Sequence, residues 1–128
     1  MLRFMFVFGA IADGAVAVTW ILIAAGFEIP NILNGYVGSG SDYQLAMYLA
    51  ALLMAGWASL LAWGAIRPIE RRGLLLITAV LLMLSVITEL LFFRDILDGI
   101  GFVFGITRRT LLSLIAAAIY FYSLRKDA

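Results

Sequence analysis

Cysteine and histidine are both absent from the 128-residue chain. Without cysteine, the chain can form no disulfide, no thiolate metal site and no thiol nucleophile. Without histidine, ordinary haem ligation, histidine-based zinc sites and the usual proton carrier near neutral pH are also excluded. The sequence therefore predicts no cofactor and no metal, and any acid–base chemistry would fall to carboxylates, tyrosines or groups assisted by arginine.

Charged residues are scarce as well. They make up 13% of the chain, whereas 65% of its residues are hydrophobic and the mean hydropathy is +1.09. A soluble domain is about half apolar with about a quarter of its residues charged, and a chain of this length leaves much of its surface exposed. The apolar excess must therefore face lipid, which predicts an integral membrane protein with membrane lipid as a partner. The net charge of +1, without basic runs and interleaved aromatics, gives nucleic-acid binding no support.

Apolar runs long enough to cross a bilayer, which takes roughly 20 residues, occur four times in the chain. They predict an all-α fold in which residues 1–128 form a single domain, an integral membrane four-helix bundle. The predicted spans are at about residues 4–27, 43–66, 74–97 and 102–124. The start of the first run resembles a signal peptide, but Asp13 interrupts it and its hydrophobicity continues past Trp20. We therefore predict that this helix is retained.

The positions of lysine and arginine in the short connections indicate how the spans are oriented. Basic residues precede the first span, join the second to the third, and follow the fourth: Arg3, Arg67, Arg71, Arg72, Arg125 and Lys126. The connection between the first two spans contains Glu28 and Asp42 but no basic residue. Both termini are therefore predicted to be cytoplasmic, in the cytoplasmic membrane of a prokaryote.

The stretch 88–110 concentrates charge between two apolar segments. Its charged residues are Glu89, Arg94, Asp95, Asp98, Arg108 and Arg109. In one placement, the third helix stops near Phe93, the fourth starts near Thr110, and the residues between them form a solvated outer loop. In the other, residues 98–101 form the complete turn between two helices. Asp-Gly favours a turn, residues 102–106 are too apolar for a wet loop, and a later start would leave the last helix only about 15 apolar residues. We therefore predict the tight turn, which places Arg94, Asp95, Asp98 and Arg108 at the outer rim, with Arg94 and Asp98 paired.

A tight turn would bring two of these charges to matching depth inside the membrane. At a rise of about 1.5 Å per residue, Glu89 would lie roughly 12 Å and Arg109 roughly 10 Å from the outer helix ends. Asp13 would lie near the midplane. Helical spacing predicts that each helix turns one weakly polar stripe inward, which on the second span is Gln44, Tyr48, Ala55 and Ser59. The candidate ligand-binding residues on these stripes are Asp13, Glu89, Arg109, Tyr48, Tyr120 and Ser113.

The inward charges allow two interpretations. A charge at the centre of a spanning helix costs about 2.5–3.5 kcal/mol, so these charges must pair or meet water. In the structural interpretation, Glu89 and Arg109 form a salt bridge that fixes the helix register, and Asp13 hydrogen-bonds to Tyr48 or Tyr120. In the functional interpretation, a hydrated cavity opens toward the outer leaflet and the acids hold a proton or a ligand. Intramembrane ionisable residues are functional by default, which favours the cavity.

The run LLAWGAIRPIERRGLLLITAVLL is followed by a helix that ends in RDILDG and by a last helix that ends in LRK. With this architecture and its arginine–proline turn, the region 43–126 resembles small bacterial four-helix membrane proteins of the DoxX-like kind. The resemblance implies a four-helix membrane fold. Members of the family include a subunit tied to quinone-linked sulfur oxidation, but no motif here transfers a catalytic residue, so the resemblance implies no reaction.

Three functions remain open, and we favour the first. It is the binding or transport of a small lipophilic or ionic ligand: Asp13 and Glu89 would bind a cation or proton, Arg109 would hold an anionic group or tune Glu89, and the small size predicts a homo-oligomer or larger complex. The second is a membrane enzyme of the isomerase, hydrolase or cyclase type, with Asp13 and Glu89 as catalytic acid and base on a lipophilic substrate. The third is a non-catalytic subunit of a membrane complex.

Overall fold

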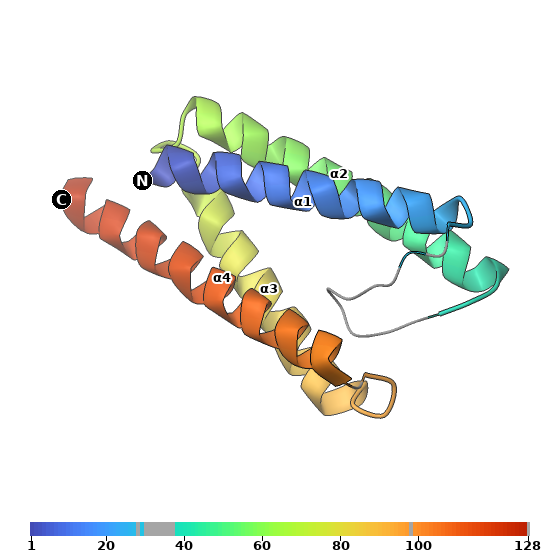
Figure 1. The fold of residues 1–128 in the computed structure, drawn as a ribbon. Helices are drawn as coiled ribbons and strands as arrows, with labels where there is room; N and C mark the ends of the chain where they lie inside the picture. The colour runs from blue at the N-terminus through green and yellow to red at the C-terminus, as the bar shows by residue number, and fades with distance from the viewer. Residues whose placement is uncertain (28, 30–37, 98, 128) are drawn as a thin grey trace. The chain divides into compact units, whose positions relative to one another are not determined.

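The computed structural model describes residues 1–27, 29, 38–97 and 99–127. Within these residues the chain forms four α-helices: α1 (Leu2–Ala24), α2 (Ser41–Ile66), α3 (Gly73–Phe92) and α4 (Gly99–Asp127) (Figure 1). The predictions of an all-α fold and of four span-like helices are confirmed for this part of the chain, because each of these helices is long and apolar enough to cross a membrane. Two compact units divide the helices, one built on α1 and α2 and the other on α3 and α4.

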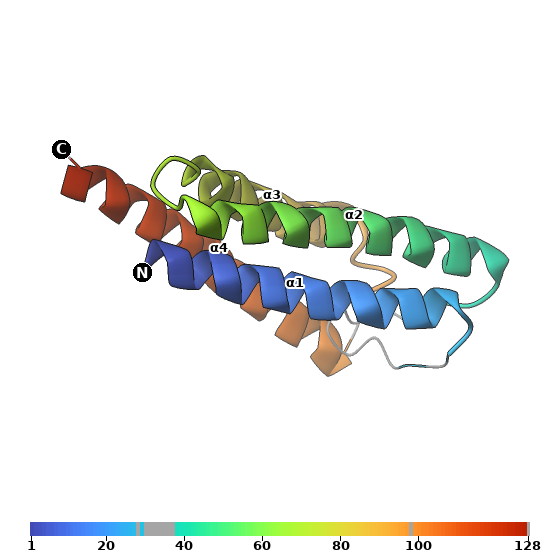
Figure 2. The same ribbon diagram turned by 90° about the horizontal axis from the view of Figure 1, so that it is seen from above.

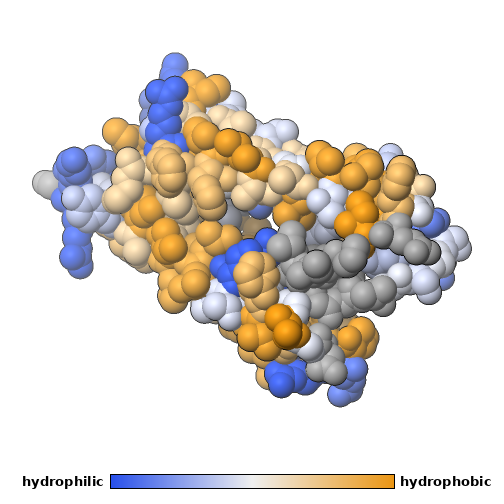
Figure 3. All heavy atoms as spheres, viewed as in Figure 1, coloured by the Kyte–Doolittle hydropathy of each residue, from blue (hydrophilic) through white to orange (hydrophobic). Residues whose placement is uncertain are grey.

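Large apolar side chains are exposed on every helix of the described chain. Examples are Ile11 on α1, Leu53 on α2, Leu91 on α3 and Val103 on α4. Apolar residues likewise cover much of the face seen in Figure 3, whereas hydrophilic residues gather mainly at its margins. These surfaces would be unfavourable in water, but they have the composition of helices that contact lipid.

α1 ends at Ala24, before the predicted end of the first span, because a glycine stops the helix. Gly26 adopts φ +97°, a left-handed conformation that L side chains rarely take. Its N–H donates to the Ile23 carbonyl at 3.0 Å, and the Phe27 N–H donates to the Leu22 carbonyl at 3.1 Å. This is the Schellman arrangement, which satisfies carbonyls that a helix end would otherwise leave without partners.

α1 and α2 run side by side in opposite directions (Figures 1 and 2). The buried residues of α2 are mostly three, four or seven positions apart, as expected for a helix that packs along one seam: Met47, Ala51, Ala58, Leu61, Gly64 and Ala65. The predicted inward stripe of α2 lies elsewhere, because all of its members are exposed: Gln44, Tyr48, Ala55 and Ser59. The prediction chose this face for its polarity, whereas small residues that admit close helix contact define the packed face.

Gly64 of α2 lies against the fully buried ring of Phe6 of α1. A Cβ atom at position 64 would come within 2.5 Å of the Phe6 Cε1 atom, so the ring would have to move. We predict that Gly64→Ala destabilises the protein by about 1–3 kcal/mol, the usual cost of overpacking. Thermal unfolding in mild detergent measures the effect.

Gly56→Ala is the matched control for this prediction. Gly56 lies in the same helix, but a Cβ atom there would meet nothing within 4 Å. The control should be neutral or slightly more stable, because alanine forms helices better than glycine. Equal unfolding temperatures for the two variants would contradict the close contact at Gly64.

α3 and α4 form an antiparallel helical hairpin. At one end, Arg72 pairs with Asp127 and also donates a hydrogen bond to the Ser123 carbonyl at 3.3 Å. Further along, the buried Ser113 hydroxyl donates to the Ala79 carbonyl at 2.7 Å. These bonds, at the Arg72 end of the hairpin and near its middle, fix one register between α3 and α4.

The connection between α3 and α4 combines features of the two predicted placements. α3 ends at Phe92, where the loop placement put it, while α4 begins at Gly99, close to the start that the tight turn required. Between them, the Ile96 and Leu97 N–H groups donate to the Phe93 carbonyl at 3.1 and 3.2 Å. The connection is therefore a short hydrogen-bonded turn that begins earlier than predicted.

The structure describes three of the four residues that were predicted at the outer rim. Arg94 and Asp95 are exposed, and the Arg94 guanidinium carbon lies 5.2 Å from the centre of the Phe102 ring, within reach of a cation–π contact. Arg108 is half-buried on α4. Asp98, the predicted partner of Arg94, lies outside the described residues.

Candidate functional site

Glu89 and Arg109, which the sequence placed on the inner faces of neighbouring helices, form an ion pair in the α3–α4 hairpin. Arg109 Nη1 donates to Glu89 Oε1 at 2.6 Å, and Nη2 donates to Oε2 at 2.5 Å. Two parallel N–H···O bonds make the pair bidentate, which is the strongest geometry between these groups. The pair therefore joins α3 to α4 toward the connecting turn.

Other hydrogen bonds hold Arg109 in place. Its Nε donates to the Gly105 carbonyl at 3.1 Å, and Nη1 also donates to the Ser85 hydroxyl at 3.2 Å. Arginine carries five N–H donors, and together with the two bonds to Glu89 these contacts use four of them. Arg109 is only 9% exposed. It is thus a buried group that positions the Glu89 carboxylate.

Glu89 lies closer to a helix end than predicted. Because α3 stops at Phe92, Glu89 is in its last turn, about 5 Å from the helix end at 1.5 Å per residue. The predicted depth of roughly 12 Å is wrong because it assumed a helix that continues to Leu97. A negative charge is disfavoured at a helix C-terminus by the helix dipole. Arg109 supplies the compensating positive charge.

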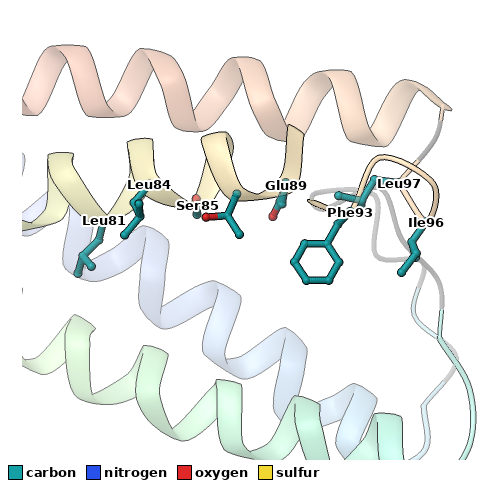
Figure 4. Close-up of a pocket in the computed structure, with 8 residues that line it drawn as sticks. Leu81, Leu84, Ser85, Glu89, Phe93, Ile96 and Leu97 are labelled. Atoms are coloured by element: carbon teal, nitrogen blue, oxygen red, sulfur yellow. The ribbon is translucent and has the colours of Figure 1, made fainter. Parts of the chain in front are cut away.

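The Glu89 side chain also lines a groove of about 540 Å³ that follows α3 and the turn after it (Figure 4). Its lining is mostly apolar, with three polar side chains among leucines, a phenylalanine and an isoleucine: Leu81, Leu84, Ser85, Thr88, Glu89, Phe93, Ile96 and Leu97. Figure 4 shows Ser85, Glu89 and Phe93 projecting to the same side of α3. Small-molecule sites have about this volume and this mixture of apolar walls with a few polar groups.

The other predicted residues of this hairpin do not line the groove. Ser113 is buried and its hydroxyl is used by the Ala79 carbonyl. Tyr120 is half-buried on α4, where its ring meets the edge of the Phe121 ring at 5.3 Å. Among the described residues of α3 and α4 that were predicted as ligand contacts, Glu89 is the one that faces the groove.

Asp13 and Tyr48 belong to the other compact unit, which is built on α1 and α2. Asp13 is half-buried on α1, and Tyr48 is exposed on α2. A second groove, of about 410 Å³, lies in this unit and is lined mainly by small and aliphatic residues, including Gly14, Ala17 and Ala51. Asp13 and Tyr48 are not among its lining residues.

Ser85 and Thr88 complete the polar part of the α3 groove, and neither was predicted as a site residue. Ser85 is four residues before Glu89 and Thr88 is three residues after Ser85. Residues at these spacings share one face of a helix, so the spacing alone could have found both. On this helix the prediction selected the charged residue Glu89 alone, although Ser85 lies on the same predicted face.

No protein-family model matches the chain, and no curated protein or solved structure matches it.

Proposed function

We propose that the chain is a four-span integral membrane protein that binds a small amphipathic molecule in the α3 groove. The observation that carries this proposal is the position of Glu89. Arg109 binds the Glu89 carboxylate on the side away from the groove, while 22% of the Glu89 side chain stays exposed at the apolar groove. A fixed polar group beside apolar walls suits a ligand with a polar head and an apolar tail.

The proposal includes the orientation in the membrane. The basic residues around 67–72 and near the C-terminus favour a cytoplasmic location for both termini. The turn between α3 and α4 then lies at the outer face, and the groove is reached from the outer leaflet. The resemblance of residues 43–126 to DoxX-like proteins is compatible with this arrangement and adds no ligand to it.

A non-catalytic role in a larger complex is the second candidate, because Glu89 and Arg109 satisfy each other without a ligand. Under this alternative, the pair only fixes the register of the hairpin. An enzyme with Asp13 and Glu89 as acid and base has less support, because Glu89 accepts two hydrogen bonds from a buried arginine. Ligand binding requires the groove, whereas the structural role does not, so an experiment that fills the groove tests one against the other.

Leu84→Trp tests the proposed function by filling the groove. Leu84 lines the groove, is 55% exposed, and takes no part in the ion pair. With the protein in lipid nanodiscs and a long-chain alcohol that carries a photoreactive diazirine in its tail, we expect wild-type labelling within residues 81–97. In the variant this labelling should fall about tenfold, which corresponds to a loss of about 1.4 kcal/mol of binding free energy.

Leu114→Trp provides the control, since Leu114 is a comparably exposed leucine on α4 outside the groove. It should label as the wild type does. If Leu84→Trp also labels like the wild type, the groove binds no such molecule and the structural role of the pair is favoured.

A further inference from the structure

The polar groups of the α3 groove accept hydrogen bonds. An ionised carboxylate has no hydrogen to donate, and each of its oxygens can accept more than the one bond that Arg109 supplies at Glu89. The Ser85 hydroxyl donates its hydrogen to the Leu82 carbonyl at 2.8 Å, so toward other partners it too is an acceptor. The Thr88 hydroxyl can take either role. A ligand head that bonds to Glu89 or Ser85 therefore has to supply the hydrogen.

An anionic head does not fit this site. Arg109 is only 9% exposed, and its guanidinium donates hydrogen bonds to Gly105, Ser85 and Glu89. Its positive charge is therefore separated from the groove by the Glu89 carboxylate. An anion in the groove would face the Glu89 carboxylate first, and like charges at close range repel each other. This geometry leaves Arg109 the role of tuning Glu89, rather than that of holding an anionic group.

A cationic head is also disfavoured. Glu89 and Arg109 are neutral as a pair, so an ammonium group would give up its hydration for a carboxylate whose charge is already balanced. A neutral hydroxyl has a smaller hydration to lose and still forms a charge-assisted bond with the carboxylate. The smaller loss of hydration, together with the hydrogen bond to the carboxylate, favours a neutral hydrogen-bond donor.

We infer that the ligand is a neutral apolar molecule with a hydroxyl head, such as a long-chain alcohol, and this inference rests on the proposed function. Its hydroxyl donates to the Glu89 carboxylate in the last turn of α3. Its tail follows the groove toward Leu84 and Leu81, about 12 Å along the helix. With the turn at the outer face, the head lies near the membrane surface and the tail points inward, as a lipid of the outer leaflet does.

The test compares three probes with the same diazirine-bearing tail and different heads: a hydroxyl, an ammonium and a carboxylate. Each is added to the full chain in nanodiscs of zwitterionic lipid, and labelling within residues 81–97 is quantified. We expect the hydroxyl probe to label about tenfold more than the carboxylate probe, the effect of one charge-assisted hydrogen bond. The ammonium probe should also label less than the hydroxyl probe. Preferential labelling by the carboxylate or ammonium probe overturns the inference but leaves ligand binding in place.

Glu89→Gln tests whether Glu89 selects the head. The amide can still accept from Arg109, but the site then carries the uncompensated charge of that arginine. The preference should shift from the hydroxyl probe toward the carboxylate probe, and an unchanged order of the three probes would count against Glu89 as the acceptor. If this variant fails to fold, the order of the probes on the wild type still decides the inference. Labelling by none of the three within residues 81–97 would overturn the proposed function itself.

Discussion

Arg109→Met is expected to destabilise the protein by about 3–5 kcal/mol, the cost of breaking a buried ion pair from one side. The substitution removes the bonds to Glu89, Ser85 and the Gly105 carbonyl. It also leaves the Glu89 carboxylate at the C-terminal end of α3, where the helix dipole opposes it. Because folded proteins are stable by only about 5–15 kcal/mol, the loss should be plain in SDS-induced or thermal unfolding from mild detergent.

The double variant Glu89→Met, Arg109→Met shows whether the unpaired Glu89 charge causes the loss of stability in Arg109→Met. Replacing both members of a buried pair by apolar groups is often neutral or stabilising, so most of the lost stability should return. Labelling by the long-chain alcohol should be lost in the double variant, because the hydrogen-bond acceptor at position 89 is gone. A double variant as unstable as the single one would show that Arg109 stabilises the hairpin through Ser85 and Gly105 instead.

The helices and the pairing of Glu89 with Arg109 could be predicted because local sequence encodes both. Four apolar runs of sufficient length give four helices in the described chain. Helical periodicity places Glu89 on the face of Ser85 and Arg109 on the face of Ser113, and these faces meet in the hairpin. Two opposite charges in apolar surroundings pair because an unpaired buried charge is costly.

The end of α3 could not be predicted in the same way. Apolar and charged residues alternate after Phe92, and Leu97 is buried although it lies beyond the helix. Apolar residues therefore continue into the turn, and hydropathy does not mark where the backbone leaves the helix. The predicted distance of Glu89 from the helix end depended on this boundary, so the error in the boundary became an error in that distance.

The packed face of α2 and the surroundings of Asp13 show a second limit of prediction from helical periodicity. α2 has one face with weakly polar residues and another with small ones, and the small residues form the contact with α1. Close packing depends on the fit between two surfaces, such as Gly64 against Phe6. Periodicity within one helix cannot supply that fit, and for the same reason it could not decide which residues surround Asp13.

The orientation in the membrane has an all-or-none test, because a chain without cysteine gives no background in cysteine labelling. Single cysteines at three exposed positions report on three connections: Ser39→Cys before α2, Ile69→Cys between α2 and α3, and Lys126→Cys near the end of α4. In intact bacterial cells, a membrane-impermeant maleimide should label the first and leave the other two until the cells are broken, because basic residues favour the cytoplasmic side. Labelling of all three in intact cells would contradict insertion, and the inverse pattern would contradict the orientation.

Ile100→Cys connects this topology to the ligand. Ile100 is 87% exposed at the start of α4, beside the turn that closes the α3 groove. If it labels from outside together with Ser39→Cys, the Glu89 end of the groove is at the outer surface, and a hydroxyl-bearing amphiphile can enter from the outer leaflet with its tail along α3. If it labels only in broken cells, the groove opens to the inner leaflet, and the same head-group chemistry would then select a molecule from the cytoplasmic side.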